Sequence, residues 1–410
     1  MPDRKRSRVA PTTITMLQEA VISARDHSYA LCIRGAGTLD GMGGRVTADL
    51  DIHMTHLKGI AAFEPGDLTI GTFAGTTLAE LTAVLREHRL MAVLDAPHPQ
   101  QATIGGTLAG GWLGPRRHRF GRPRDAVIGT TVVMADGRIA SSGGMVVKNV
   151  TGYDLSKLYI GSFGTLGILA RVNFKVQPIP ARIRAISARL PEHTRERVIE
   201  RMQGLSGQIS AALLIDGFHR EIDGEDGSDG RLVVLLETSE ILLEQATRDT
   251  RGALGQAGVP EATIVDLGPM DHLQRIIDAG VATIGERSIT YRVLGDADDH
   301  ERRSSQLSAD LSRTGLRMER IVDACNGDLF VRLSDRDSRS FAGKLADCDE
   351  IVHQHFPRAI VVACTSPIRD QLTIWGEHPA AIEKMHLLKS AFDPDHRLNP
   401  GRFLEATTNG

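Results

Sequence analysis

The strongest candidates for chemistry in this sequence are backbone N–H groups that glycines expose, rather than reactive side chains. The segment "IRGAGT" (33–38) places two glycines where a buried strand would end. Glycine permits positive φ angles and close approach, so several N–H groups can converge on a phosphate or pyrophosphate. A simple dinucleotide-binding fold would need a third glycine where Asp40 stands, with a helix directly after it, and the sequence offers neither.

Two further glycine segments indicate a ligand that lies along the backbone. The segment "HPQQATIGGTLAGGWLGPRRHRFG" (98–121) mixes glycines with small and apolar residues, and "GGMVVKNVTGYDLSKLYIGSFGTLGI" (143–168) does the same. A flat ligand would need such thin walls. The alternative is a long surface loop, but so apolar a loop would be poorly solvated, which favours the ligand wall.

Other reactive patterns are weak. No cysteine pair forms C-x-x-C, so neither an iron–sulfur cluster nor structural zinc is expected, and reduced, buried thiols are favoured. The cysteines are Cys32, Cys325, Cys348 and Cys364. His353 and His355 form H-x-H at the expected end of an amphipathic helix. Without a Ser-His-Asp pattern or a G-x-S-x-G elbow, acyl transfer is unsupported.

Composition narrows the class of protein. The chain has 410 residues, which suggests two domains, and its net charge of −3 points neither to nucleic acid nor to an anionic membrane. The basic start "MPDRKRSRVA" lacks the apolar core of a secretory signal, so a short disordered arm is expected. No apolar run could span a bilayer. We expect a cytoplasmic protein and leave peripheral docking on a membrane complex open.

The elements that would position the glycines alternate between helix and strand. Helix periodicity covers 14–27, and a buried strand leads into the first glycine turn. Thr77 and Glu80 form a capping-box pattern before a helix at 78–88. A β-hairpin is expected over 126–142, with its turn at Asp136-Gly137. With strands at 67–75 and 167–180, these signals predict an α+β domain over residues 1–180.

The rest of the chain is read as a second domain and a returning tail. Strands are expected at 232–239 and 328–334, a helix at 193–205, and an exposed acidic hairpin loop at 220–230. We predict an α+β substrate or cap domain over 181–385. The C-terminal stretch 386–410 would be a helix end and a proline-punctuated tail.

The ordered motifs resemble a known family. "RGAGT", "ATIGG" and "GSFGTLGI" are similar to the flavin-contacting segments of the vanillyl-alcohol-oxidase type of FAD-binding proteins, whose FAD domain is named after p-cresol methylhydroxylase. "VKNVTGYDLSKL", "GPRRHRFGRPRDAVIG" and "FDPDHRLNPGRF" resemble more narrowly the bacterial glycolate oxidase flavoprotein subunits and related D-2-hydroxyacid dehydrogenases. The resemblance implies a p-cresol-methylhydroxylase-type FAD-binding domain of two subdomains, to which the C-terminal segment returns.

The resemblance also implies where FAD would bind. "RGAGT" would cradle the pyrophosphate, the second segment would line the flavin and ribityl side, and Ile168 would contact the adenine end through its backbone. Asn399 would either reach toward the isoalloxazine edge or be a plain turn residue, and Lys148, Asn149 and Tyr153 would be local support. The implied cofactor-binding residues are Arg34, Gly35, Ala36, Gly37, Thr38, Pro97, Ala102, Thr103, Ile104, Gly105, Gly106, Ala109, Gly110, Gly114, Gly164, Gly167, Ile168 and Asn399.

Two departures from the family pattern matter. Thr38 stands where covalent flavoproteins of this type often carry histidine, so attachment there is excluded and FAD is expected to be non-covalent. Related hydroxyacid dehydrogenases commonly carry a motif close to H-A-G-D-G-N-L-H, which supplies metal ligands. The matching stretch is "DACNGDLF" (323–330), where Asp323 and Phe330 replace the two histidines, so no bound metal is expected.

We therefore expect an FAD-dependent oxidoreductase acting on CH–OH groups, as a subunit of a glycolate-type 2-hydroxyacid oxidase or dehydrogenase. Its implied partners are a second flavoprotein and an iron–sulfur subunit, which would dock on an exposed apolar face in the middle domain. A free-standing FAD enzyme and a non-catalytic electron-relay or structural subunit remain alternatives. The catalytic residues are not identified; weak candidates outside the FAD domain are His272, Tyr291, Arg292 and Glu377.

Overall fold

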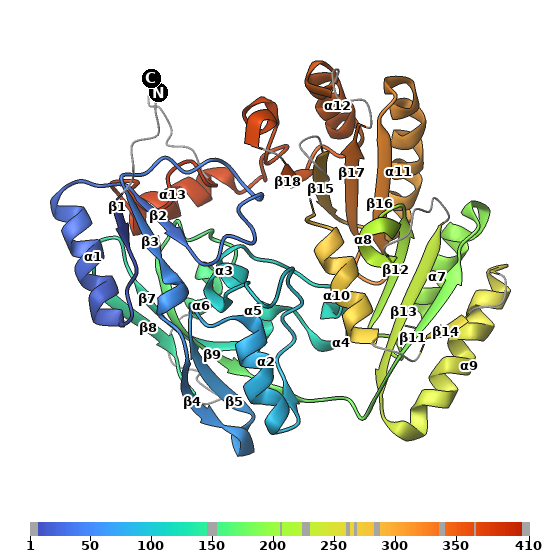
Figure 1. Ribbon diagram of the computed structural model, residues 1–410, viewed down its shortest axis with the longest axis horizontal. Helices are drawn as coiled ribbons and strands as arrows, with labels where there is room; N and C mark the ends of the chain where they lie inside the picture. Colours follow the sequence, from blue (N-terminus) through green and yellow to red (C-terminus); the bar gives the residue numbers. More distant parts are fainter. Residues whose placement is uncertain are drawn as a thin grey trace. The chain divides into compact units, whose positions relative to one another are not determined.

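The computed structural model divides the chain into two compact units (Figure 1). The described residues are 7–145, 154–205, 207–223, 230–259, 263–265, 269–282, 288–335, 341–364 and 366–403. Unit 1 comprises residues 1–113, 122–179 and 379–410, and unit 2 comprises 114–121 and 180–378. The expected first domain, residues 1–180, contained the short segment 114–121. In the structure this segment belongs to unit 2, and the chain then returns to unit 1 at residue 122.

The first subdomain of unit 1 is a small parallel sheet with one long helix. Strand β3 (Leu50–His53) lies between β1 (Ser7–Val9) and β2 (Leu31–Arg34). Helix α1 (Ile14–Asp26) begins after Thr13, whose side chain accepts a hydrogen bond from the Met16 N–H and satisfies one of the unpaired donors at the helix start. Because β2 and β3 are parallel, the glycine turn that follows β2 lies at the carboxyl end of the strands of this sheet.

The second subdomain of unit 1 is an antiparallel sheet in the order β4-β5-β9-β7-β8. Its strands are β4 (Ile60–Glu64), β5 (Thr69–Phe73), β7 (Val127–Val133), β8 (Ile139–Gly143) and β9 (Ile168–Lys175). The expected hairpin is confirmed, because β7 pairs with β8 and the Gly137 N–H closes the turn onto the Met134 carbonyl. The capping box is also confirmed, with Thr77 and Glu80 exchanging both bonds at the start of α2 (Leu78–Glu87).

Short elements connect these parts of unit 1. They are the helices α3 (Ile104–Ala109), α5 (Pro123–Ala126), α6 (Ser156–Tyr159) and α13 (Ile382–Phe392), the strand pair β6 (Leu90–Met91) and β10 (Gln177–Pro178), and the 3-10 turns Met54–His56 and Pro65–Asp67. The expected tail therefore begins with a helix and then runs back along β2, where Leu398 bridges to Leu31 in parallel. Residues Lys148, Asn149 and Tyr153 lie outside the described residues.

Unit 2 is built on one antiparallel sheet in the order β14-β11-β13-β12-β16-β17-β15-β18. The strands are β11 (Arg182–Arg189), β12 (Ala211–Asp216), β13 (Arg231–Thr238), β14 (Thr263–Val265), β15 (Ser288–Leu294), β16 (Arg317–Asp323), β17 (Asp328–Ser334) and β18 (Ile360–Cys364). Strands β13 and β17 confirm the two strands expected from the sequence. Together with unit 1 they confirm the α+β class.

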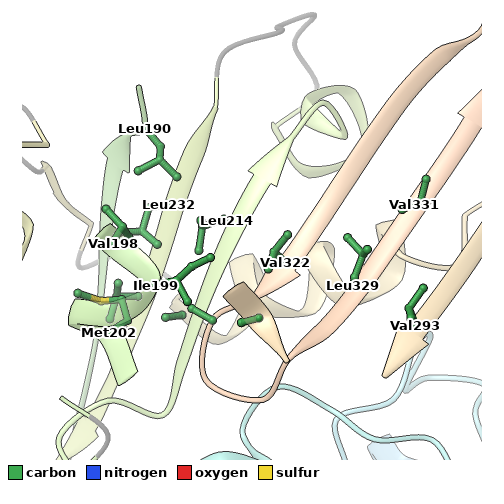
Figure 2. Close-up of a cluster of buried hydrophobic side chains, with 14 of the residues drawn as sticks. Leu190, Val198, Ile199, Met202, Leu214, Leu232, Val293, Val322, Leu329 and Val331 are labelled. Atoms are coloured by element: carbon green, nitrogen blue, oxygen red, sulfur yellow. The ribbon is translucent and has the colours of Figure 1, made fainter. Parts of the chain in front are cut away.

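Helices cover both faces of this sheet. One face packs against α7 (Arg195–Gly204), α9 (Glu240–Gln256), α11 (Ala297–Leu311) and α12 (Phe341–His355), and the other against α8 (His219–Asp223) and α10 (Pro269–Ala279). Figure 2 shows strand residues such as Leu214 and Val322 on the same side as Ile199 of α7. Leu213 packs on the opposite face, as the alternation of side chains along a strand requires.

Two smaller features complete unit 2. Segment 114–121 contains the one-turn helix α4 (Arg117–Phe120), and short 3-10 turns lie at Glu192–Thr194, Ser312–Thr314 and Ser366–Gln371. The expected acidic hairpin loop at 220–230 is wrong in its first part, because α8 occupies it and Ile222 is buried against the sheet. No helix in the described ranges is long and apolar enough to cross a membrane.

Candidate functional site

The turn after β2 forms a cradle of unengaged backbone donors in unit 1. Gly37 has φ +82°, a conformation that favours glycine, and a Cβ on it would lie 2.7 Å from Arg34 Nη2 and 2.9 Å from Asp40 Oδ2. Within the described residues, no acceptor receives a hydrogen bond from the backbone N–H groups of Gly35, Ala36, Gly37 or Thr38. Converging N–H groups of this kind fit an anion such as a pyrophosphate.

The second glycine segment forms the neighbouring wall as helix α3. Thr103 caps this helix by accepting a hydrogen bond from the Gly106 N–H at 3.2 Å. A Cβ on Gly35 would collide with the same Thr103 hydroxyl oxygen, so the phosphate turn and the helix cap are in direct contact. On its other side α3 packs tightly on the end of β5, where a Cβ on Gly105 would come 2.8 Å from the Cβ of Ala74.

The third glycine segment is hydrogen-bonded along α3. The Gly161 N–H donates to the Leu108 carbonyl at 2.9 Å, and the Phe163 N–H donates to the Ala109 carbonyl at 2.8 Å. The turn at 161–167 then leads into β9, whose first residue is Ile168. The second and third segments, about fifty residues apart in sequence, therefore form one continuous backbone surface.

Asn399 joins the first and third segments. Its Oδ1 accepts a hydrogen bond from the Ile33 N–H at 2.7 Å, and its Nδ2 donates to the Phe163 carbonyl at 2.7 Å. Its own N–H donates to the Leu31 carbonyl at 2.9 Å, and its φ of +44° is one that asparagine tolerates. Asn399 therefore holds two loops together, and its expected reach toward the isoalloxazine edge stays a prediction.

A buried ion pair fixes this returning segment. Lys389 Nζ donates to the Thr165 carbonyl at 2.8 Å and to the Leu398 carbonyl at 3.1 Å, and it pairs with the Asp393 carboxylate. Burial lowers the pKa of Lys389, while the Asp393 charge opposes this shift. Asp393 in turn accepts the Leu398 N–H at 2.8 Å, so the tail is tied to itself and to the third glycine segment.

Two adjoining hollows of about 70 and 50 Å³ lie where the three segments meet. The expected site residues that line them are Arg34, Gly35, Ala36, Gly37, Thr38, Thr103, Gly105, Gly106, Ala109, Gly110, Gly164, Gly167, Ile168 and Asn399. Pro97, Ala102 and Ile104 are buried and do not line either hollow, and Gly114 belongs to unit 2. The glycine walls and unengaged donors fit an extended cofactor containing a pyrophosphate.

Sequence reasoning missed two charged residues of this surface. Asp40 and Arg402 both line the larger hollow beside Arg34. In the sequence, Asp40 indicated only that the third glycine of a dinucleotide-binding pattern is absent. Arg402 stands three residues after Asn399 in the returning tail, and its place within "LNPGRF" was the available signal.

In unit 2, the stretch 323–330 forms the hairpin between β16 and β17. Asp323 is buried and accepts hydrogen bonds from the Cys325 and Asn326 N–H groups and from Asn326 Nδ2. Burial, and then the nearby Asp328 carboxylate, raise the pKa of Asp323 to about 7. Phe330 lies with its ring 5.2 Å from the Arg292 guanidinium.

The same hairpin is bound by segment 114–121. Arg117 pairs with both oxygens of Asp328, one of them at 3.1 Å, and Arg292 also pairs with that carboxylate. Arg116 forms a second buried ion pair, with Glu237 on β13, at 3.0 Å. In the sequence, the basic run "GPRRHRFG" was assigned to the second glycine wall and to a family pattern. In the structure, Arg116 and Arg117 are engaged in largely buried ion pairs of unit 2.

The four candidate catalytic residues do not all converge, because Tyr291 and Arg292 lie on opposite faces of the unit 2 sheet. Tyr291 lies in the core beneath α12, where its hydroxyl donates to Asp349 at 2.8 Å, and burial raises its pKa well above the usual value. Arg292, the next residue on β15, points to the opposite face and is held by Asp328. His272 is half-buried on α10, and the Glu377 side chain is exposed.

In the part of the chain that the structure describes, no three histidine, cysteine, aspartate or glutamate side chains are grouped so that they could hold a metal ion. The expectation that the protein binds no divalent metal remains a prediction for metal analysis.

Comparison with known proteins gives both a family and a fold. A family model described as an FAD binding domain matches residues 6–154. The chain is 30% identical over 334 residues to the glycolate oxidase subunit GlcE of Escherichia coli (strain K12), covering 75% of this chain and 94% of that protein. It is 31% identical over 181 residues to the glycolate oxidase subunit GlcD of Bacillus subtilis (strain 168), covering 44% and 38%.

A solved structure of p-cresol methylhydroxylase matches with a TM-score of 0.76 at 15% identity, over 98% of this chain and 89% of that one. At this identity the match concerns the fold alone, and it confirms the fold class that the glycine motifs implied.

Proposed function

The chain belongs to the family of FAD-dependent oxidoreductases that includes the glycolate oxidase subunit GlcE, and on this basis we propose that it is the flavin-holding subunit of a multi-subunit 2-hydroxyacid oxidase or dehydrogenase. Its cofactor is FAD, and its family acts on hydroxyacids.

One observation carries the proposal: three glycine segments from distant parts of unit 1 meet at a single surface. The Phe163 N–H joins the third segment to α3, Gly35 contacts the Thr103 hydroxyl, and Asn399 joins the first segment to the third. The N–H groups of residues 35–38 would hold the pyrophosphate, and the glycines of α3 and of 161–167 would lie along the rest of the cofactor.

The chain's own residues would bind and orient the cofactor, and FAD, when bound, would supply the redox chemistry. Thr38 offers no side-chain nitrogen for a covalent link, so the cofactor would be held by non-covalent contacts. In unit 2, both oxygens of Asp328 are already engaged by Arg117 and Arg292. A carboxylate held this way is a poor general base, which supports a subunit that relies on a partner for oxidation of the hydroxyacid.

Membership of a complex is supported by similarity to two proteins that are both named glycolate oxidase subunits. Unit 2 also carries strongly exposed apolar side chains at Ile241 and Leu242, which are 89% and 56% exposed at the start of α9. We propose a second flavoprotein and an iron–sulfur subunit as partners. The four free cysteines form no C-x-x-C motif that could hold an iron–sulfur cluster, so electrons would have to leave the flavin through another protein or to oxygen.

The deciding assay compares the lone chain with a mixture that contains both proposed partners, at equal flavin content. Glycolate and D-lactate serve as substrates with an artificial electron acceptor. We expect very slow turnover by the lone chain and restored turnover in the mixture. Rapid turnover by the lone chain, unchanged by the partners, would leave the free-standing enzyme as the correct alternative.

The mode of cofactor attachment has a separate test. Acid precipitation should release FAD into a yellow supernatant, because no histidine stands at position 38 to link it. Flavin that stays with the pellet, or FMN in the supernatant, would contradict this proposal.

A further inference from the structure

Two guanidinium groups face the phosphate turn from opposite ends of the chain. Arg34 ends β2, and Arg402 lies in the returning tail; both line the larger hollow together with residues 35–40. The backbone of Arg402 is fixed independently of its side chain, since its N–H donates to the Asn399 carbonyl at 3.1 Å and its carbonyl accepts the Gly44 N–H at 2.8 Å. A substitution there would alter the guanidinium without removing these bonds.

The Asp40 carboxylate links the two guanidinium groups. One of its oxygens pairs with Arg34, and the other lies 3.4 Å from Arg402 Nη2. Arg402 Nη1 also donates to the carbonyls of Asp40 and Gly44 at 3.3 Å each. The three side chains together carry one net positive charge, beside the unengaged N–H groups of residues 35–38.

We propose that Arg34 and Arg402 both bind the pyrophosphate of FAD, and that Asp40 is a tethered internal anion with which the pyrophosphate competes. This rests on the placement of FAD given above. A pyrophosphate bridge carries two negative charges and several oxygens in the geometry that guanidinium groups match best, so it outcompetes a single carboxylate. Asp40 lowers the attraction of the site for weaker anions, and so acts as a specificity residue.

The first test removes one guanidinium from the full-length protein. After flavin is stripped, FAD binding is followed by quenching of flavin fluorescence at several salt concentrations. Arg402→Gln should weaken FAD binding by roughly tenfold and reduce its dependence on salt, because one charge contact is lost. Arg402→Lys should recover most of the affinity. Arg138→Gln is the matched control, since the Arg138 side chain is 81% exposed and outside the hollow.

The second test removes the competing charge. Asp40→Asn should tighten FAD binding by roughly three- to tenfold, and inorganic pyrophosphate should compete with FAD more effectively than it does in the unaltered protein. Weaker FAD binding by Asp40→Asn would show that Asp40 supports the turn, and would overturn the competition.

Two further outcomes separate the proposals. Equal loss in Arg402→Gln and Arg402→Lys, with an unchanged salt dependence, would mean that Arg402 only packs against the turn, and would overturn its role toward the pyrophosphate. Failure of the unaltered protein to bind FAD would instead overturn the proposed function itself. Circular dichroism of each variant confirms that the comparison is made between folded proteins.

Discussion

At the scale of single residues, the candidate site depends on missing side chains as much as on present ones. Gly35 and Gly37 bring the phosphate turn close to α3 and to Asp40. A Cβ atom on either glycine would collide with a neighbouring side chain, which would have to move. The sequence predicted both positions, because the need for glycine at a phosphate turn is local. It could not predict that Asp40 faces Arg402, because residues 362 positions apart meet only after folding.

Gly35→Ala should reduce FAD affinity by about fivefold or more, because the new methyl group overlaps the Thr103 hydroxyl and must displace either the turn or the helix cap. A helix cap of this kind is worth about 1 kcal/mol. FAD titration of the stripped protein measures the loss of affinity. Gly66→Ala is the control, since a Cβ there meets nothing within 4 Å. The double variant Gly35→Ala/Thr103→Ala should recover part of the affinity; no recovery would contradict the collision.

Asp323→Asn should flatten the pH dependence of stability between about pH 3 and pH 8, a range that spans the ordinary pKa of an aspartate and the raised pKa of Asp323. The pKa of Asp323 is raised to about 7 in the folded protein, so its stabilising contribution is full at acid pH and is lost as pH rises through that value. Relative to the variant, the unaltered protein should lose up to about 4 kcal/mol across this range. Urea unfolding at several pH values measures the difference, and parallel curves would contradict the assignment.

At the scale of elements, the predictions from sequence worked where the signal was local. The capping box of α2, the hairpin of β7 and β8, and the strands β13 and β17 each follow from short patterns. The acidic stretch after β12 was misjudged, because its composition suggested a loop while Ile222 packs α8 onto the sheet. Segment 114–121 was also misplaced, since only distant carboxylates on β13 and β17 explain its arginines.

Glu237→Gln should cost about 3–5 kcal/mol of unfolding free energy, because it leaves the buried Arg116 guanidinium without this counter-charge. Glu240→Gln, on the neighbouring helix α9, should cost less than about 1 kcal/mol, since its pair with Arg182 is exposed to solvent and screened by salt. Chemical denaturation of the two variants gives the comparison. Similar small losses would mean that the Arg116 pair does not hold segment 114–121 in unit 2.

At the scale of the whole molecule, the two units are interleaved in sequence although each is compact. Unit 1 takes in residues from before, within and after the stretch that builds unit 2. Sequence patterns placed the two main boundaries near 180 and 385 because the glycine motifs end near 180 and the tail carries a family pattern of its own, "FDPDHRLNPGRF". They did not show how the tail is held, which depends on Asn399 and the buried Lys389–Asp393 pair.

A chain that stops after His378 should fail to retain FAD, because it lacks the residues that bridge β2 and the third glycine segment. Unit 2 should still unfold cooperatively, since residues 379–410 belong to unit 1. The ratio of flavin to protein after gel filtration, with circular dichroism during denaturation, tests both parts. Full flavin occupancy in the shortened chain would show that the tail is dispensable for the cradle.

The contact between Ile33 and Asn399, 366 residues apart, also sets an order of events during synthesis. Ribosomes add roughly 5–20 residues per second, so the stretch 180–378 takes roughly 10–40 seconds to make. Throughout that time β2 lacks its bridge to Leu398, and the segment that leads into the phosphate turn lacks its hydrogen bond to Asn399. The nascent chain must therefore keep an unfinished sheet edge from pairing with other chains, and it can take up its cofactor only after almost all of its residues have been joined.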